Sequence, residues 1–261
     1  MSAPGPTPGS PSGASAPDPA APAVDGDALP DTGREHPDDS GAVPARPAAG
    51  QVRVERLVTA GTFSLDGGTW DVENNVWLVG DDDACVVIDP AHDPQKVVEA
   101  VAGRRVVAIL LTHAHDDHIR SVKEVAGQVG ARIHLHPDDT VLWEQVYPHT
   151  PFDAELADGQ EFAVGGVRLT VLHTPGHSPG SVCFSAPELG EHGVVFSGDT
   201  LFQGGPGATG RSYSDFGTII GSIRERLLTL PEGTEVLTGH GDPTTIGAEA
   251  PHLQEWIDRG H

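Results

Sequence analysis

The sequence predicts an α/β fold in which two β-sheets are covered by helices. Short runs rich in Val, Ile and Leu recur from Val52 onward, and clusters of Gly and Asp separate them. Helical patterns with one apolar face stand between these runs, and the runs fall into two groups along the chain. Two groups of strands with intervening helices indicate two packed sheets. We expect one folded domain over residues 51–261.

The first fifty residues differ from the rest in composition. Residues 1–50 hold 11 of the 23 prolines and no aromatic side chain. Such a segment has little apolar surface to bury, so ordering it would cost conformational entropy without compensation. We therefore predict a disordered extension rich in Pro, Ala and Gly over residues 1–50.

The first group of predicted elements lies between Val52 and residue 146. Asp93 and Pro94 are typical of a helix start, and Gly103 of a helix end. The apolar run 106–111 lacks polar alternation, which favours a strand buried on both faces. The predicted strands are 52–58, 75–79, 84–88, 106–111 and 132–135, and further helices are predicted at 116–126 and 137–146.

The second group consists mainly of short strands. A helix from about residue 215 to 228 places five large apolar side chains on one face, which should pack on a sheet. The predicted strands are 161–164, 167–172, 181–185, 194–197 and 235–237, and a last helix is predicted at 249–258.

Charge and composition exclude several classes of protein. Lys and Arg total 15 against 38 Asp and Glu, and the formal net charge is −23. So acidic a chain repels phosphate backbones, and we expect no nucleic-acid partner. It lacks both a run of about 18 apolar residues and a secretory signal pattern, so we expect a cytoplasmic protein with no membrane contact. Cys85 and Cys183 cannot make a disulfide framework and should be buried thiols. The oligomeric state is unknown from the sequence.

The densest cluster of chemically active residues is Thr-His-Ala-His-Asp-Asp-His at 112–118. It follows the predicted buried strand and opens a helix, which is the sheet edge where ligands usually bind in open α/β folds. In extended backbone His113 and His115 point the same way, whereas Asp117 and His118 enter the first helical turn. Imidazole nitrogen together with carboxylate oxygen suits Zn, Fe or Mn.

Three later strand ends each offer one further ligand. These are His177 in TPGH, Asp199 in SGDT and His240 in TGHG. Glycine beside each residue permits a tight turn and leaves room for a ligand. Four strand-end loops carrying His or Asp in this order predict a metal site rather than unrelated surface residues.

An HxHxDH motif followed by a lone His, Asp and His after strand ends resembles the metallo-β-lactamase-fold hydrolases. The resemblance covers about residues 52–261 and implies a single-domain αββα sandwich with two divalent metal ions, with zinc expected and iron or manganese as alternatives. It implies that Asp89, behind the ligands, orients one of them. It further implies that the first metal is held by His113, His115 and His177, the second by Asp117, His118 and His240, and that Asp199 bridges them.

The ligand set predicts hydrolysis. Two adjacent metal ions activate water for attack on a carbonyl, and Asp117 would accept the proton. No separate strong acid stands at a motif position, which favours leaving groups that depart as anions, such as thiolates. The segment GDTLF with the glycine-rich stretch after it resembles glyoxalase II, which implies a small-molecule thioester as substrate.

A narrower resemblance points to the carrier thiol. Four segments resemble a compact actinobacterial hydrolase group proposed to hydrolyse S-acyl mycothiol, including the S-formyl adduct. We expect no counterpart of the helical domain with which glyoxalase II holds glutathione. Arg211 and Tyr213, with Trp143 and Tyr147, are the candidates for binding the carrier. The four segments are TFSLDGGTWDVENNVW, HTPGHSPGSVC, GDTLFQGGPGATGRSYSDF and TGHGDPTTIGAEAPHLQEW.

Three alternatives stay open at this point. A persulfide dioxygenase would use one iron on His113, His177 and Asp199. A lactonase would use the same seven ligands without releasing a thiol. A metal-binding or redox-sensing module would keep the ligands but lack turnover.

Overall fold

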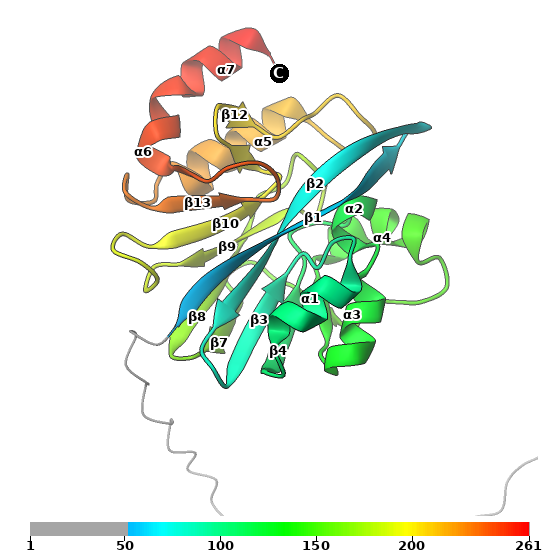
Figure 1. Ribbon diagram of the computed structural model, residues 1–261. Coiled ribbons are helices and arrows are strands. Elements are labelled where there is room, and N and C mark those ends of the chain that lie inside the picture. The colour runs from blue at the N-terminus through cyan, green and yellow to red at the C-terminus, as the bar shows by residue number, and fades with distance from the viewer. Residues whose placement is uncertain (1–51, 261) are drawn as a thin grey trace, which may run out of the picture. The chain divides into compact units, whose positions relative to one another are not determined.

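The computed structural model describes residues 52–260, so the predicted extension over residues 1–50 lies outside the described residues. The described chain forms two six-stranded sheets packed face to face. Figure 1 shows α1 to α4, in shades of green, beside the first sheet and α5 to α7, in orange and red, beside the second. This arrangement confirms the predicted αββα sandwich.

The first sheet has the order β1-β2-β3-β4-β5-β6. β1 and β2 form one long antiparallel hairpin, and β3 to β6 run parallel to one another. The strands are β1 (Arg53–Leu65), β2 (Gly68–Gly80), β3 (Ala84–Ile88), β4 (Arg105–Leu110), β5 (Ile133–Leu135) and β6 (Ala154–Glu155). The helices of this half are α1 (Pro94–Val101), α2 (Asp116–Ile119), α3 (Val122–Val129) and α4 (Thr140–Val146), with a 3₁₀ turn at Pro137–Asp139.

The second sheet has the order β14-β13-β10-β9-β8-β7. Its strands are β7 (Glu161–Val164), β8 (Val167–His173), β9 (Val182–Ala186), β10 (Val194–Gly198), β13 (Glu235–Thr238) and β14 (Thr244–Thr245). A small ribbon is made by β11 (Leu201–Phe202) and β12 (Gly205–Pro206). The helices are α5 (Phe216–Ser222), which continues as a π-helical turn at Ile223–Leu227, α6 (Ile246–Glu249) and α7 (Leu253–Arg259), the last two joined by a 3₁₀ turn at Ala250–His252.

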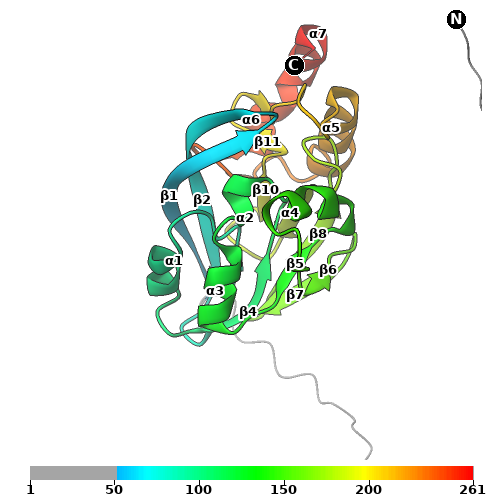
Figure 2. The ribbon, with the colours of Figure 1, turned by 90° about the vertical axis from the view of Figure 1, so that its right-hand side faces the viewer.

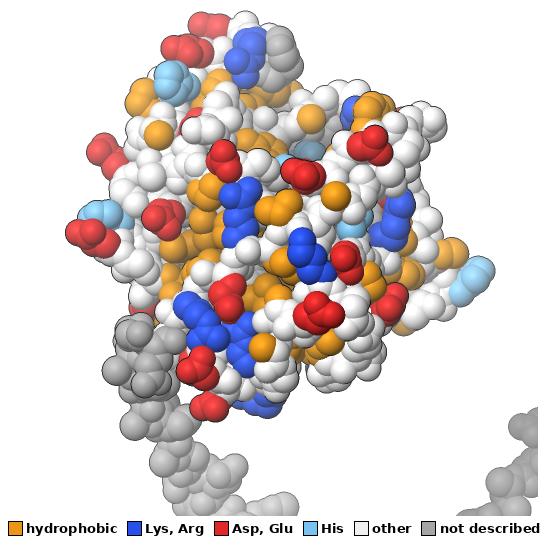
Figure 3. Space-filling model, viewed as in Figure 1, with side chains coloured by type: hydrophobic (Ala, Val, Ile, Leu, Met, Phe, Trp, Pro, Cys, Tyr) orange, Lys and Arg blue, Asp and Glu red, His pale blue; other side chains and the backbone are white. Residues whose placement is uncertain are grey.

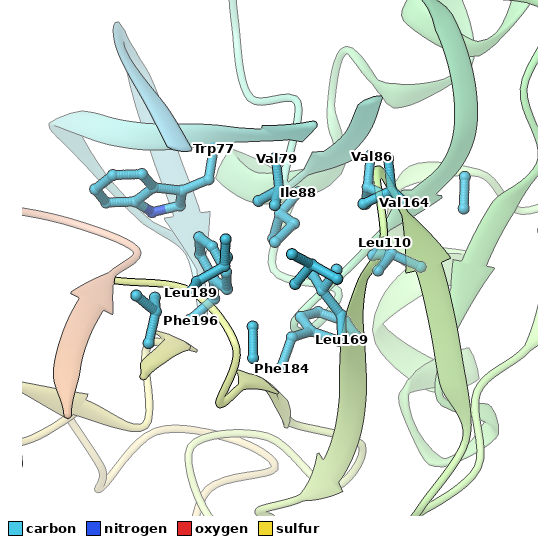
Figure 4. Packing of buried hydrophobic residues seen from close by; sticks show 14 of the residues in the cluster. Trp77, Val79, Val86, Ile88, Leu110, Val164, Leu169, Phe184, Leu189 and Phe196 are labelled. Carbon is cyan, nitrogen blue, oxygen red and sulfur yellow. The ribbon is translucent and has the colours of Figure 1, made fainter. Parts of the chain in front are cut away.

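The facing sides of the two sheets enclose the main hydrophobic core. Figure 4 shows Trp77, Ile88 and Leu110 of the first sheet facing Phe184 and Phe196 of the second. Two further apolar clusters lie between each sheet and its helices. β4, for which the apolar run predicts burial on both faces, is buried at most positions after the exposed Arg105, with Val107 half-buried. Burying each large side chain of this kind contributes about 1.5–3 kcal/mol, so the sandwich supplies a rigid base for the loops at the strand ends.

The β1–β2 hairpin is much longer than predicted. The strands predicted at 52–58 and 75–79 are only its base, and residues 59–65 pair with 68–74 as well. Asp66 and Gly67 both have positive φ, which is the conformation of a two-residue type I′ turn. The far half of the hairpin extends beyond the core beside α2 (Figure 2), so its residues lack the apolar alternation that marks a half-buried strand.

The helix predicted at 116–126 is divided into α2 and α3. The break falls at Arg120 and Ser121. Tyr147 Oη donates to the carbonyl oxygens of Ile119 and Arg120 at 2.9 and 2.7 Å, which satisfies groups that a continuous helix would have bonded internally. The sequence gives no local signal for this long-range contact.

One face of the molecule (Figure 3) carries both acidic and basic side chains, and the two cysteines are buried. On the face in Figure 3 acidic, basic and hydrophobic side chains are interspersed. None of the helices between residues 52 and 260 is long and apolar enough to span a membrane. Cys85 and Cys183 are buried and free, as predicted. Burial raises the pKa of Cys183 to about 11, so this thiol stays protonated and unreactive.

Candidate metal centre

The ligand residues named from the sequence all lie at one end of the sandwich. His113 and His115 follow β4, and His177 follows β8. Asp199 and His240 follow β10 and β13. Each strand therefore delivers its ligand in a short loop at the strand end, and the rigid sheets fix the distances between the loops.

The first cluster consists of three buried imidazoles. His115 Nδ1 lies 3.1 Å from His113 Nε2 and 3.0 Å from His177 Nε2. Zn–N bonds of about 2.0–2.1 Å place tetrahedral ligand atoms about 3.3 Å apart. The three nitrogens therefore converge on one point at the spacing that a single metal ion requires.

The outer nitrogens of two of these rings are protonated. Thr112 Oγ1 donates its only proton to Asp89 Oδ2 at 2.6 Å, so it must accept from His113 Nδ1 at 3.0 Å. His177 Nδ1 donates to the carbonyl oxygen of Ala208 at 2.9 Å. Both rings therefore turn an Nε2 lone pair toward the cluster, as metal ligands do.

His115 faces the cluster with a different ring nitrogen from that of His113 and His177. Its Nδ1 faces the cluster, and its buried Nε2 has no hydrogen-bond partner among residues 52–260. A buried donor without a partner costs free energy. This orientation is explained if Nδ1 has a ligand to bind.

The second cluster combines two imidazoles with a carboxylate. His240 Nε2 lies 3.2 Å from His118 Nε2 and 3.3 Å from Asp117 Oδ2, and His118 Nε2 lies 3.6 Å from the same oxygen. His118 Nδ1 donates to Asp89 Oδ2 at 2.9 Å, and His240 Nδ1 donates to the carbonyl oxygen of Glu73 at 2.7 Å. The inner nitrogens, Nε2 of His118 and Nε2 of His240, therefore face a common point together with Asp117 Oδ2.

Asp199 lies between the two clusters. Its Oδ2 is 3.6 Å from His177 Nε2 and 3.3 Å from His240 Nε2, and its Oδ1 is 3.4 Å from His118 Nε2. Within the described part of the chain Oδ1 is buried without a hydrogen bond. A carboxylate that touches members of both clusters occupies the bridging position expected from the sequence.

The charges of the second cluster require compensation. Burial lowers the pKa of His118, but Asp117 and Asp199 outweigh burial and raise it well above the usual value. The same balance raises the pKa of His240 to about 10. Burial acts against ionised Asp199, yet His240 and His118 keep its pKa well below the usual range. Without a metal, protons on the two imidazoles balance the two carboxylates, and divalent ions would supply that charge instead.

The first cluster has the opposite electrostatics. Burial lowers the pKa of His115 to about 3, and it lowers the pKa of His113 well below its usual value. Both rings are therefore neutral, which is the protonation state that a metal ligand needs. Neutral imidazoles in one cluster and compensated carboxylates in the other make the donor set suitable for two divalent ions.

Asp89 lies behind both clusters, where the sequence placed it. Its carboxylate accepts from the Thr112 amide at 2.8 Å, from Thr112 Oγ1 and from His118 Nδ1. Through Thr112 it also fixes the ring of His113. One carboxylate thus orients a ligand of each cluster.

Asp139 is a supporting residue that sequence reasoning missed. It is fully buried and accepts from the Ala114 amide at 2.8 Å, the Ser178 hydroxyl at 2.8 Å and the Gly180 amide at 2.6 Å. It therefore ties the loop of His113 and His115 to the loop of His177. The only local signal was two aspartates at the start of a predicted helix, which is also an ordinary capping pattern.

A further group, His136, Asp138 and His173, does not have the geometry of a metal site. The two rings stack at 4.1 Å with 13° between their planes, so their in-plane lone pairs cannot meet at one ion. His136 Nδ1 accepts from the Asp138 amide at 3.4 Å, and His173 Nε2 donates to the carbonyl oxygen of Pro179 at 3.1 Å. These residues support the His177 loop instead.

The hairpin tip and the 203–217 loop meet beside the first cluster. The guanidinium of Arg211 lies 4.0 Å from the ring centre of Trp70 and 5.6 Å from that of Phe63. The Phe63 ring is 5.2 Å from the His115 ring, and the Ser212 amide donates to Asp66. Arg211 therefore lies close to the metal centre. Phe63 and Trp70 were missed because the Asp-Gly turn between them was not recognised as a hairpin.

The other residues proposed for carrier binding differ in their surroundings. Tyr213, at 46% exposure, follows Arg211 and adopts a positive φ. The prediction for Trp143 was wrong, because its ring is buried and its Nε1 donates to the carbonyl oxygen of Thr150. The prediction for Tyr147 was also wrong, because its hydroxyl is engaged at the break between α2 and α3.

Residues 69–240 match the family model of the Metallo-beta-lactamase superfamily, and the chain belongs to this superfamily. It is 35% identical over 192 residues to the "Probable metallo-hydrolase YqgX" of Bacillus subtilis, which covers 68% of this chain and 90% of the relative. It is 33% identical over 193 residues to "Hydroxyacylglutathione hydrolase GloC" of Haemophilus influenzae, with 68% and 90% covered. A crystal structure of TTHA1623 in a di-iron-bound form has a TM-score of 0.61 and 35% identity, covering 74% of this chain and 96% of that chain.

Asp89→Asn is predicted to weaken metal binding at both clusters. Asparagine keeps one acceptor oxygen, so its NH₂ must face either the Thr112 amide or the pair formed by Thr112 Oγ1 and His118 Nδ1. Loss of such a partner typically costs about 10–100-fold in affinity. The measurement is the metal content per chain after dialysis against graded chelator. Asp93→Asn is the control, because asparagine also caps α1 from that exposed position. Loss confined to one ion, or no loss, would contradict the shared role of Asp89.

Proposed function

We propose that the chain is a dinuclear metal-dependent hydrolase that cleaves thioesters of a low-molecular-weight thiol. The observation that carries the proposal is the pair of ligand clusters with Asp199 between them. The resemblance of GDTLF and the following glycine-rich segment to glyoxalase II supports thioester chemistry. So does similarity to a protein named hydroxyacylglutathione hydrolase.

Two divalent ions held by these clusters would supply Lewis-acid activation of the carbonyl group and of water at neutral pH. Asp117 would take up the proton of the attacking water, because its carboxylate is ionised at neutral pH and lies in the second cluster beside His118 and His240. As the new C–O bond forms, the C–S bond breaks and the thiolate leaves as an anion. The proton then passes to the thiolate, and the products are a carboxylic acid and a thiol.

Arg211, Tyr213, Trp70 and Phe63 would hold the carrier. A guanidinium offers five donors to hydroxyl or carboxylate oxygens, and the exposed rings of Trp70 and Tyr213 offer apolar faces. Resemblance to the actinobacterial group favours S-acyl mycothiol over S-acyl glutathione. Zinc is the metal we propose, and the di-iron form of a 35% identical structure makes iron the second candidate.

Free-thiol release in the absence of oxygen tests this function. The substrates are S-formyl and S-lactoyl thioesters of mycothiol and of glutathione, with chelator-treated protein as the control. We expect rapid release that depends on metal, and faster release from the mycothiol esters. Failure to release thiol from any of the four would contradict thioester hydrolysis. Oxygen uptake with a persulfide, or ring opening of an acyl-homoserine lactone, would then identify the chemistry that replaces it.

Arg211→Ala is predicted to raise KM about tenfold with little change in kcat. A hydrogen bond to a charged group contributes about 1.5–3 kcal/mol, and the carrier would lose this contact without any change at the reacting carbonyl. Steady-state kinetics with the best thioester give the measurement. Arg224→Ala, which removes an exposed arginine paired with Glu225, should leave both constants unchanged. A fall in kcat at constant KM would contradict a carrier-binding role.

A further inference from the structure

Asp117 is held from behind by a residue that is not one of the predicted metal ligands. Asn74 of β2 donates from Nδ2 to Asp117 Oδ2 at 3.0 Å. Both side chains are buried, and Asn74 is 0% exposed. The oxygen that receives this hydrogen bond is the one that faces His118 and His240. Asn74 therefore acts on the atom by which Asp117 joins the second cluster.

The orientation of the Asn74 amide is set by His92. His92 Nε2 lies 2.8 Å from Asn74 Oδ1. A carboxylate oxygen can only accept, so Asn74 turns its NH₂ to Asp117 and its oxygen to His92. His92 Nε2 must then carry a proton. Without that donor the buried Asn74 oxygen would have no partner, and only the carboxylate would hold the amide in this orientation.

The protein holds His92 in an unfavourable backbone conformation. Its φ is +50°, a region that favours glycine. Ser121 Oγ donates to its carbonyl oxygen and holds the backbone there. Strain of this kind persists where the surrounding structure requires it, and it is concentrated at functional sites.

The hairpin makes room for the ring of His92. A Cβ atom on Gly61 of β1 would lie 2.1 Å from His92 Nδ1 and 2.5 Å from two other ring atoms. Any larger side chain at position 61 would displace the ring. One hydrogen bond, from Asn74 Nδ2 to Asp117 Oδ2, therefore depends on the space at Gly61 and on the strained backbone of His92.

We propose that His92 and Asn74 are positioning residues, which hold Asp117 Oδ2 against His118 and His240. The proposal rests on the proposed function only where it concerns turnover by Asp117. Losing the His92 donor leaves the buried Asn74 oxygen without a partner, so the amide and then the carboxylate should shift from their positions. The result would be weaker binding of one ion, by about 10–100-fold, and a lower kcat at unchanged KM.

Two substitutions at position 92 separate positioning from packing. His92→Gly removes the donor and relieves the backbone strain, so we expect an unchanged or higher Tm together with the losses above. His92→Gln keeps an N–H donor near the position of Nε2 but also keeps the strain, so we expect most of the metal affinity and kcat to be retained. His149→Gln, at an exposed loop position, is the control.

Gly61→Ala supplies an independent variant that leaves His92 in place. It should displace the ring and reproduce the losses of His92→Gly. In the His92→Gly background the same substitution should have no further effect, because there is no ring to displace. An additive loss in the double variant would contradict the proposal.

The primary readout is titration of metal-free protein with Co²⁺, followed by its visible absorption. Wild type should bind two ions, and His92→Gly should show one ion unchanged and one weakened. Equal affinity in wild type and His92→Gly, or a loss that follows a drop in Tm, would overturn the proposal. If wild type cleaves no thioester, the proposed function fails, while the Co²⁺ titration still decides whether His92 and Asn74 position Asp117.

Discussion

Two buried carboxylates, Asp117 and Asp199, impose the constraint on which the rest of the site depends. Neither can remain ionised inside the protein without positive charge beside it. The structure meets this need with His118 and His240, whose pKa values the two carboxylates raise against the effect of burial. Every outer nitrogen of the second cluster is meanwhile bonded to an acceptor. The site is thereby arranged so that divalent cations can supply the positive charge without moving the side chains.

The fold supplies this arrangement by bringing loops from both sheets to one end. β2 contributes two side chains that support the site. Asn74 points to Asp117, whereas Asn75 donates to the carbonyl oxygens of Thr238 and Gly241 and ties the His240 loop to the first sheet. Successive residues of a strand face opposite sides, so two adjacent asparagines can support two different ligands. Each of these two asparagines therefore supports one particular ligand or ligand loop.

Local sequence was sufficient for the elements whose signal is local. The unbroken apolar run of β4, the cap at Asp93 and the glycines beside His177 and His240 predict strands, a helix start and ligand loops where the structure has them. The far half of the hairpin could not be predicted from apolar alternation, because residues 59–74 project past the core. The break between α2 and α3 depends on Tyr147, which is distant in sequence.

The candidate ligands were predictable because they share a motif, whereas of their supports only Asp89 was predicted, from the family resemblance. Asp139 and His92 act through contacts between segments that no spacing rule connects. Trp143 was misassigned for the related reason that an aromatic side chain on a helix can be buried or exposed, and only packing decides. Arg211 was proposed from its place in the 203–217 loop after GDTLF, but its partners Trp70 and Phe63 became visible only with the hairpin.

The central claim is that the two clusters bind two ions which share Asp199. The most direct measurement is anomalous scattering at the zinc edge from crystals grown with excess zinc. We predict two peaks, one among His113, His115 and His177 and one among Asp117, His118 and His240, with Asp199 contacting both. A single peak contacted by His113, His177 and Asp199, with the second cluster empty at excess metal, would contradict it.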